Sequence, residues 1–260
     1  MLKKIYNWSS SWTGTIVIVL TIIFFVAQAF VIPSGSMKNT LLIGDMLFVK
    51  KFAYGVPTPT IPWIEVKVLP DFKGNGHLIE GERPKRGDIV VFRYPHDPDI
   101  HYVKRAVATS GDTIFLKNKI LYLHPKEGND FVKTEFKDYE TIDIDGKLFV
   151  VSPYEKEHKG IHNDQNVTRN LIAPKELFDM QEIVIPEDET FMMGDNRDHS
   201  NDSRFWGSVP YKYIVGKPWF IYFSWDDDYK IRWDRVFRTV ESLEKDIDTT
   251  AEIKHEEGIY

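Results

Sequence analysis

The chain has 260 residues with 33 basic and 39 acidic side chains, and therefore a formal net charge of −6. A hydrophobic content of 42% is that of an ordinary folded protein and excludes a disordered or collagen-like chain. The acidic balance argues against nucleic acid as a partner, and the lack of cysteine excludes thiolate catalysis, disulfides and cysteine-ligated metal sites.

The first predicted element is a membrane-spanning helix over residues 14–32. This run is uncharged, and a helix of its length covers roughly the ~30 Å hydrocarbon core of a bilayer. Trp8 and Trp12 precede it, as interfacial aromatic residues do, and two lysines near the N-terminus are typical of a cytoplasmic side. We therefore expect residues 1–13 inside the cell and the remainder of the chain outside.

The same region also fits a cleavable secretory signal. Residues 27–29 (AQA) follow the apolar run in the way that the A-x-A end of such a signal does. Apolar residues continue beyond this tripeptide to Ile32, which favours a retained anchor.

Short β-rich runs, separated by glycine, proline and aspartate, follow the apolar segment. They predict an all-β, mainly antiparallel domain over residues 33–240. Asp145-Gly146 predicts a tight hairpin, because glycine tolerates the positive φ that such a turn requires. The predicted strands are residues 46–52, 88–94, 101–108, 113–116, 120–123, 147–151, 182–185 and 190–193.

The segments between and after these strands are less regular. Residues 53–87 and 124–180 are predicted to be insertions on the β core, the second of them a small β-rich subdomain. Residues 231–240 place their apolar side chains in a roughly helical stripe, which predicts a helix packed on the core. Residues 241–260 are acidic and are expected to form a tail.

Two serines flank a glycine at residues 33–37 (PSGSM), directly after the apolar segment. Gly35 lets the backbone bend closely, so Ser36 can present its hydroxyl at a cleft. Its own N–H and the hydroxyl of Ser34 can then point toward one small region, as in an oxyanion hole. A Ser-Gly-Ser tripeptide alone is also typical of a linker.

A nucleophilic serine needs a base, and the histidines are scattered through polar stretches. The strand at residues 101–108 offers Lys104 instead. With a period of two, Tyr102 and Lys104 share one face of this strand while Arg105 points to the other. Lys104 is then either a general base in a dry site or a strand lysine that reaches water.

A third polar run, GDNRDHSNDSRFWG, occupies residues 194–207. It fits either a salt-bridged surface loop or, because three aspartates lie close together, a metal site. Arg197 and Arg204 argue against a bound cation, because they supply the positive charge themselves.

Taken in order, PSGSM, RGDIVVFRYP leading to YVKRAV, and GDNRDHSNDSRFWG resemble the bacterial type I signal peptidase family, also called leader peptidase. The resemblance covers most of residues 30–123 and about 182–225. The resemblance is to a family whose better-known Gram-negative members have two membrane spans, whereas this sequence predicts one. The resemblance implies a Ser36 nucleophile and a Lys104 general base, with no metal or cofactor.

The resemblance also assigns supporting roles. Ser34 matches the serine that completes the oxyanion hole, and Ser200 matches the serine that orients the lysine amine. The substrate-binding positions that it implies are Phe30, Ile32, Met37, Leu41, Tyr102 and Val103. The charged framework that it implies is Arg105, Asp195, Asp202 and Arg204.

The implied activity is that of a membrane-bound serine endopeptidase, which removes signal peptides from exported proteins through an acyl-enzyme. Cleavage is expected after small residues at positions −1 and −3. The implied partners are signal peptides, the lipid bilayer and the secretion translocon. The implied location is the bacterial cytoplasmic membrane, with the catalytic domain on its outer, periplasmic face.

The lysine base sets a physical requirement. With an ordinary pKa of about 10.4, roughly one lysine amine in a thousand is neutral near pH 7.5. Burial can lower the pKa by several units, so Lys104 must be buried if it is the base. The sequence leaves two alternatives open: a specialised Ser-Lys peptidase that matures pilins or transfer proteins, and a non-enzymatic, membrane-tethered β module.

Overall fold

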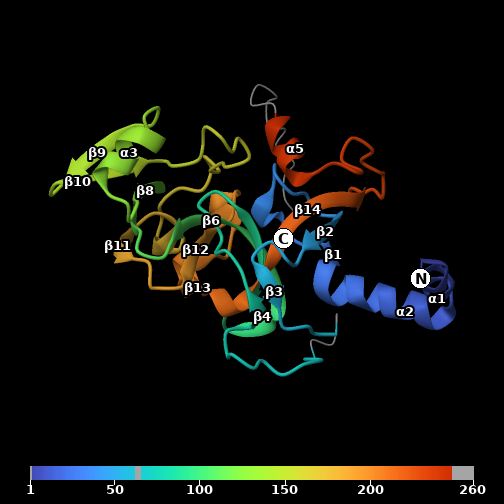
Figure 1. The fold of residues 1–260 in the computed structure, drawn as a ribbon. Coiled ribbons are helices and arrows are strands. Elements are labelled where there is room, and N and C mark those ends of the chain that lie inside the picture. The colour runs from blue at the N-terminus through green and yellow to red at the C-terminus, as the bar shows by residue number, and fades with distance from the viewer. Residues whose placement is uncertain (1, 62–65, 248–260) are drawn as a thin grey trace.

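The computed structural model describes residues 2–61 and 66–247 (Figure 1). Antiparallel sheets dominate it, which confirms the predicted fold class. The larger sheet has the strand order β1-β2-β14-β5-β6-β12-β13, and its neighbouring strands pair antiparallel. These strands are β1 (Ala27–Val31), β2 (Asp45–Lys50), β5 (Ile89–Tyr94), β6 (Asp97–Thr109), β12 (Glu189–Met193), β13 (Val209–Pro210) and β14 (Ile214–Ser224).

A second sheet has the order β11-β7-β8-β10-β9, and a short pair, β3-β4, stands apart from both sheets. The turn before β10 confirms the predicted hairpin, because Asp145 and Gly146 both have positive φ values, +51° and +82°. The strands are β3 (Gly55–Pro57), β4 (His77–Glu80), β7 (Thr113–Lys117), β8 (Ile120–His124), β9 (Thr141–Ile144), β10 (Lys147–Val151) and β11 (Met180–Val184).

Helices are short and lie between or after the strands. The α-helices are α1 (Leu2–Ser9), α2 (Trp12–Thr21), α3 (Asn129–Glu135), α4 (Ser203–Trp206) and α5 (Val240–Lys245). A π-helix, η1 (Ile22–Val26), continues α2, and the 3₁₀ turns are η2 (Gly35–Met37), η3 (Lys175–Leu177), η4 (Arg197–His199) and η5 (Tyr211–Tyr213).

The second sheet changes the predicted boundaries of the inserted subdomain. We expected residues 124–180 to form a unit of their own, but β7 and β8, which precede them, pair with β10 and β11. The reason is a shared core: Val107 and Phe191 of the larger sheet pack with Ile114 and Leu123 of the smaller one. The two sheets are therefore joined by one apolar cluster.

The N-terminal region also differs from the prediction of one helix over residues 14–32. The helical path ends at Val26, and residues 27–31 form the edge strand β1, paired with β2. Pairing with the exposed edge of β2 satisfies the backbone of this segment, and it places Phe30 against the core. Within residues 2–61 and 66–247, no helix has both the length and the apolar character needed to cross a bilayer.

The C-terminal region corrects two further predictions. Residues 231–239 form turns rather than a helix: Phe237 has a φ of +60°, which breaks a helical path, and Trp233 and Phe237 are exposed. Helix α5 follows, with Val240 and Leu243 buried in the core. The start of the predicted tail at residue 241 is thus part of the folded domain, and residues 248–260 lie outside the described residues.

Candidate active site

The structure brings Ser36 and Lys104 into contact across 68 residues of sequence. Ser36 lies in the 3₁₀ turn η2 that follows β1, and Lys104 lies within β6. Lys104 Nζ donates to Ser36 Oγ over 2.6 Å. The two residues are 4% and 8% exposed, so the contact is shielded from water.

The loop after β12 holds in place the turn η2, which carries the predicted nucleophile Ser36 and is called the nucleophile turn below. Arg105 of β6 pairs with Met193 at the end of β12, so Gly194 follows directly beside Lys104. Asn196 then donates its backbone N–H to the carbonyl of Ser36 over 3.1 Å and its side-chain amide to the carbonyl of Gly35 over 3.0 Å. The position of Ser36 is therefore set by this loop.

Burial lowers the pKa of Lys104 to about 8, from an ordinary value of 10.5. The carboxylates of Asp202 and Asp195 oppose this effect because they favour the charged amine, and Arg204 adds to it. At pH 7.5 a pKa of about 8 leaves about a quarter of the amines neutral. The predicted burial of Lys104 is confirmed.

Two buried ion pairs surround the Ser36–Lys104 contact, at the positions expected for the charged framework. Arg105 forms a bidentate pair with Asp195, at 2.8 and 2.7 Å, and Arg204 does the same with Asp202, at 2.8 and 2.9 Å. Burial alone would raise the pKa of both carboxyls, but the adjacent guanidinium groups hold it below the usual range. Both pairs therefore stay charged and fix the loops that carry them.

The two supporting serines lie near this contact. Ser34 Oγ is 3.4 Å from Ser36 Oγ. Ser200 is buried against Gly194, and within residues 2–61 and 66–247 its hydroxyl donates no hydrogen bond to Lys104. The role of Ser34 in an oxyanion hole and that of Ser200 in orienting the amine stay predictions.

The predicted substrate-binding residues fall into two groups. Ile32, Met37 and Leu41 are buried in the core cluster beneath the nucleophile turn. Phe30, Tyr102 and Val103 are partly exposed, on strands β1 and β6. Only the second group presents surface to a ligand in this structure.

Two further residues, Thr40 and Asn196, support the site and were not predicted from the sequence. Thr40 Oγ1 donates to Asp195 over 2.6 Å and so ties the nucleophile turn to the ion pair. Asn196 lies within residues 194–207, one of the three runs that resemble the family, so the sequence does point to it. Nothing in the sequence around Thr40 indicates its contact with Asp195. Among the described residues, no three His, Asp or Glu side chains are placed to hold a metal ion.

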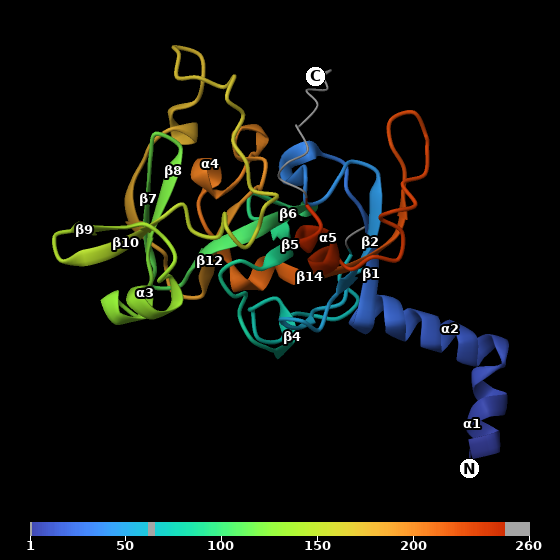
Figure 2. The same ribbon diagram turned by 90° about the horizontal axis from the view of Figure 1, so that it is seen from above.

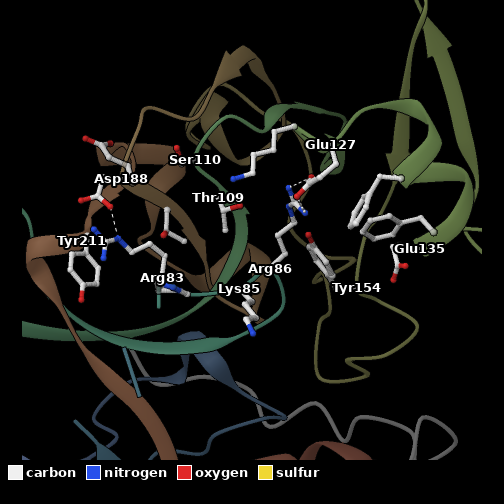
Figure 3. Close-up of a pocket in the computed structure, with 16 residues that line it drawn as sticks. Arg83, Lys85, Arg86, Thr109, Ser110, Glu127, Glu135, Tyr154, Asp188 and Tyr211 are labelled. Carbon is white, nitrogen blue, oxygen red and sulfur yellow. Dashed lines mark hydrogen bonds and ion pairs between the residues drawn. The ribbon is translucent and has the colours of Figure 1, made fainter. Parts of the chain in front are cut away.

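A hollow of about 470 Å³ lies apart from these residues (Figure 3). Arg83, Arg86 and Tyr154 are among its lining residues, and none of the predicted catalytic residues lines it. Its arginines already pair with carboxylates, Arg83 with Asp188 and Arg86 with Asp112. The residues expected to be catalytic therefore lie outside this hollow.

A buried amine in contact with a serine hydroxyl is the arrangement that a serine hydrolase with a lysine base requires. A family model described as signal peptidase, peptidase S26, matches residues 5–225 of this chain. A signal peptidase I of Helicobacter pylori (strain J99) is 50% identical, over 94% of this chain and 96% of the relative. One of Pseudomonas aeruginosa is 36% identical, over 85% of this chain and 73% of the relative.

The chain thus belongs to the signal peptidase family, peptidase S26, and is a serine endopeptidase. A solved signal peptidase I from Enterococcus faecalis overlaps it with a TM-score of 0.33 and 23% identity, over 52% of this chain and 97% of that one.

Proposed function

We propose that this protein removes signal peptides from exported proteins, with Ser36 as nucleophile and Lys104 as general base. The observation that carries this proposal is the 2.6 Å contact between Lys104 Nζ and Ser36 Oγ, made where burial lowers the pKa of the amine to about 8. A neutral amine at this distance can take the serine proton as Oγ attacks a carbonyl carbon.

The reaction proceeds through an acyl-enzyme. Ser36 Oγ forms an ester with the carbonyl carbon while Lys104 passes the proton to the departing amine. Lys104 then takes a proton from water, whose oxygen attacks the ester carbonyl, and returns that proton to Ser36 Oγ as the acid is released. The oxyanion that forms in each step is stabilised by the Ser36 N–H and the Ser34 hydroxyl, which lies 3.4 Å from Ser36 Oγ.

The substrate fits this site as an extended strand that ends in small residues. β1 is an edge strand of the larger sheet, so one side of it is open to an added chain. Ile32, Met37 and Leu41 are buried beneath the nucleophile turn, so they leave little depth for a substrate side chain above them. Shallow apolar pockets favour small side chains, such as alanine, at positions −1 and −3.

The test is cleavage of a preprotein by the full chain and by Ser36→Ala and Lys104→Met variants. Both variants should lose activity by at least a thousandfold, because neither half of the pair works alone. Asn201→Ala, an exposed change in the same neighbourhood, is the control and should cleave normally. Retention of most activity by either variant would contradict the proposal.

We further propose that the N-terminal helices anchor the protein in the cytoplasmic membrane, with the sheets on its outer face. Residues 16–20 of α2 are exposed and apolar on every side of the helix. The loop after β14 projects on the same side of the molecule as α2 and carries the exposed Trp233 and Phe237 (Figures 1 and 2). A lipid surface would cover both apolar regions.

A further inference from the structure

A buried charge cluster lies on the face of β6 opposite Lys104. Its centre is Arg105, which is 0% exposed. Besides its two bonds to Asp195, the guanidinium donates to the carbonyl of Gly87 over 2.7 Å and to Glu244 Oε1 over 2.5 Å. Glu244 is thus the second carboxylate that the buried arginine contacts.

Glu244 comes from helix α5, near the C-terminal end of the described chain. His158 Nδ1 lies 2.9 Å from the same Oε1 atom, so the carboxylate is held between an arginine and a histidine. Its side chain is 12% exposed. Burial alone would raise the pKa of Glu244, but the contacts with His158 and Arg105 lower it. Glu244 is therefore a charged, well-ordered partner of Arg105.

The contacts continue from Arg105 to the nucleophile turn. Asp195 accepts from Thr40 Oγ1, and its own carbonyl accepts from the backbone N–H of His162 over 2.9 Å. The next residue, Asn196, holds the carbonyl of Ser36. Hydrogen bonds therefore connect α5 through Arg105 to Asp195, and the peptide link from Asp195 to Asn196 continues the connection to the turn that carries Ser36.

Without Glu244, the buried arginine would keep its bonds to Asp195 and Gly87 but would lose the carboxylate that fixes its other side. A shift of Arg105 moves Asp195, and with it the loop that fixes Ser36. A displacement of this kind changes the alignment of Oγ with Nζ, to which the rate of the chemical step is very sensitive.

We propose that Glu244, assisted by His158, is a positioning residue for the Ser36–Lys104 pair, which it aligns through Arg105 and Asp195. The proposal rests on the function proposed above. It gives helix α5, and the segment around His158, an indirect part in aligning the reacting groups. Glu244 lies behind β6 and touches no substrate, so its loss should act on the chemical step.

The test is steady-state cleavage of a signal-peptide substrate by the full chain carrying Glu244→Gln. The matched control is Glu241→Gln on the same helix, because Glu241 is 51% exposed and forms only a 3.8 Å ion pair with Lys217. Glu244→Gln should lower kcat about tenfold and leave KM within twofold, with a normal thermal transition. Glu241→Gln should change neither constant.

Several results would overturn the proposal. One is a folded Glu244→Gln protein with normal kcat, and another is a higher KM with unchanged kcat. If Glu244→Gln does not fold, His158→Gln tests the proposal in its place. We expect His158→Gln to lower kcat about threefold, and an unchanged kcat would mean that the proposal is wrong. Ser36→Ala in the same assay distinguishes failure of the proposed function from failure of this inference. If Ser36→Ala is active, the proposed function is wrong. If Ser36→Ala is inactive and Glu244→Gln is unimpaired, only the role of Glu244 is wrong.

Discussion

Burial of Lys104 lowers the stability of the folded protein and also prepares the residue for the proposed chemistry. A charged amine that is 4% exposed has lost most of its hydration, and its pKa falls to about 8 because the neutral form is easier to bury. The proposed chemistry needs that neutral form next to the Ser36 hydroxyl. The same burial that destabilises the folded state therefore prepares the base.

This cost predicts how stability depends on pH. The unfolded amine keeps its proton up to about pH 10.5, whereas the folded one loses it near 8. The unfolded chain therefore binds more protons between these values, and the contribution of Lys104 to stability rises with pH across that window. Below pH 8 the buried charge costs on the order of 3 kcal/mol.

Lys104→Met should consequently stabilise the protein at pH 7, by about 2 kcal/mol once the lost hydrogen bond is allowed for, or roughly 5 °C in Tm. The gain should disappear above about pH 10.5. Calorimetry at several pH values measures it, with Lys133→Met as the control, because Lys133 is 63% exposed. An unchanged or lower Tm at pH 7 would count against the buried charge.

For single residues, the alternation of side chains along a strand and the chemistry of the residue type allow correct predictions. The period of two along β6 correctly separates Lys104 from Arg105, and the requirement for a neutral amine correctly predicts burial. Thr40 and Glu244 were missed because their contacts join residues 155 and 139 positions apart, which no local pattern reveals.

Among the elements, the loop that follows β12 leaves no room for a side chain at Gly194. A Cβ atom added at Gly194 would lie 2.3 Å from Ser200 Oγ and 2.5 Å from the carbonyl oxygen of Ser36. The second of these is backbone and belongs to the nucleophile turn. A side chain at position 194 must therefore push that turn away from Lys104.

Gly194→Ala should accordingly lower kcat/KM by at least a hundredfold, because the reacting groups tolerate little displacement. Asn201→Ala is the control, and thermal unfolding shows whether each variant is folded. A folded Gly194→Ala enzyme with activity within a few-fold of normal would mean that the loop does not position Ser36.

The element predictions failed where tertiary contacts override local pattern. Residues 27–31 extend an apolar run and suit a helix, but the free edge of β2 recruits them as a strand. β14 was not predicted, because Gly216 and Pro218 interrupt the alternation of apolar side chains along it. In the structure the strand forms with β-bulges next to these two residues. Residues 231–239 have a helical stripe, yet their aromatic side chains face solvent.

For the whole molecule, the apolar surface on the side of α2 predicts membrane binding that depends on more than the N-terminal helices. Trp233 and Phe237 are 72% and 78% exposed. If the two aromatic side chains together contribute about 1.4 kcal/mol by partial burial at the bilayer interface, Trp233→Ala combined with Phe237→Ala should weaken binding to phosphatidylglycerol-containing vesicles by about tenfold.

Leu171→Ala combined with Ile172→Ala is the control for this measurement, because these apolar side chains are even more exposed, on the loop between β10 and β11. Vesicle flotation of the full-length proteins gives the comparison. Equal losses in both double variants, or none in either, would contradict a membrane-facing role for the loop after β14.

The arrangement of the sheets was the least predictable feature at this scale. Antiparallel strands and their approximate limits follow from alternation and turn residues. The pairing of β7 and β8 with strands beyond them depends on the apolar cluster shared by the two sheets, which forms only when the chain is folded. A linear division into core and insertion therefore misplaces the boundary.

In the proposed mechanism, the Lys104 amine must lose its proton near neutral pH while it contacts Ser36. The most direct test is an NMR titration of protein labelled with ¹³C at lysine Cε, with the Lys104 resonance assigned by its absence in Lys104→Met. We predict a transition near pH 8, in keeping with the lowered pKa. A Lys104 resonance that titrates above pH 10, as a lysine side chain in water does, would rule out this lysine as the base.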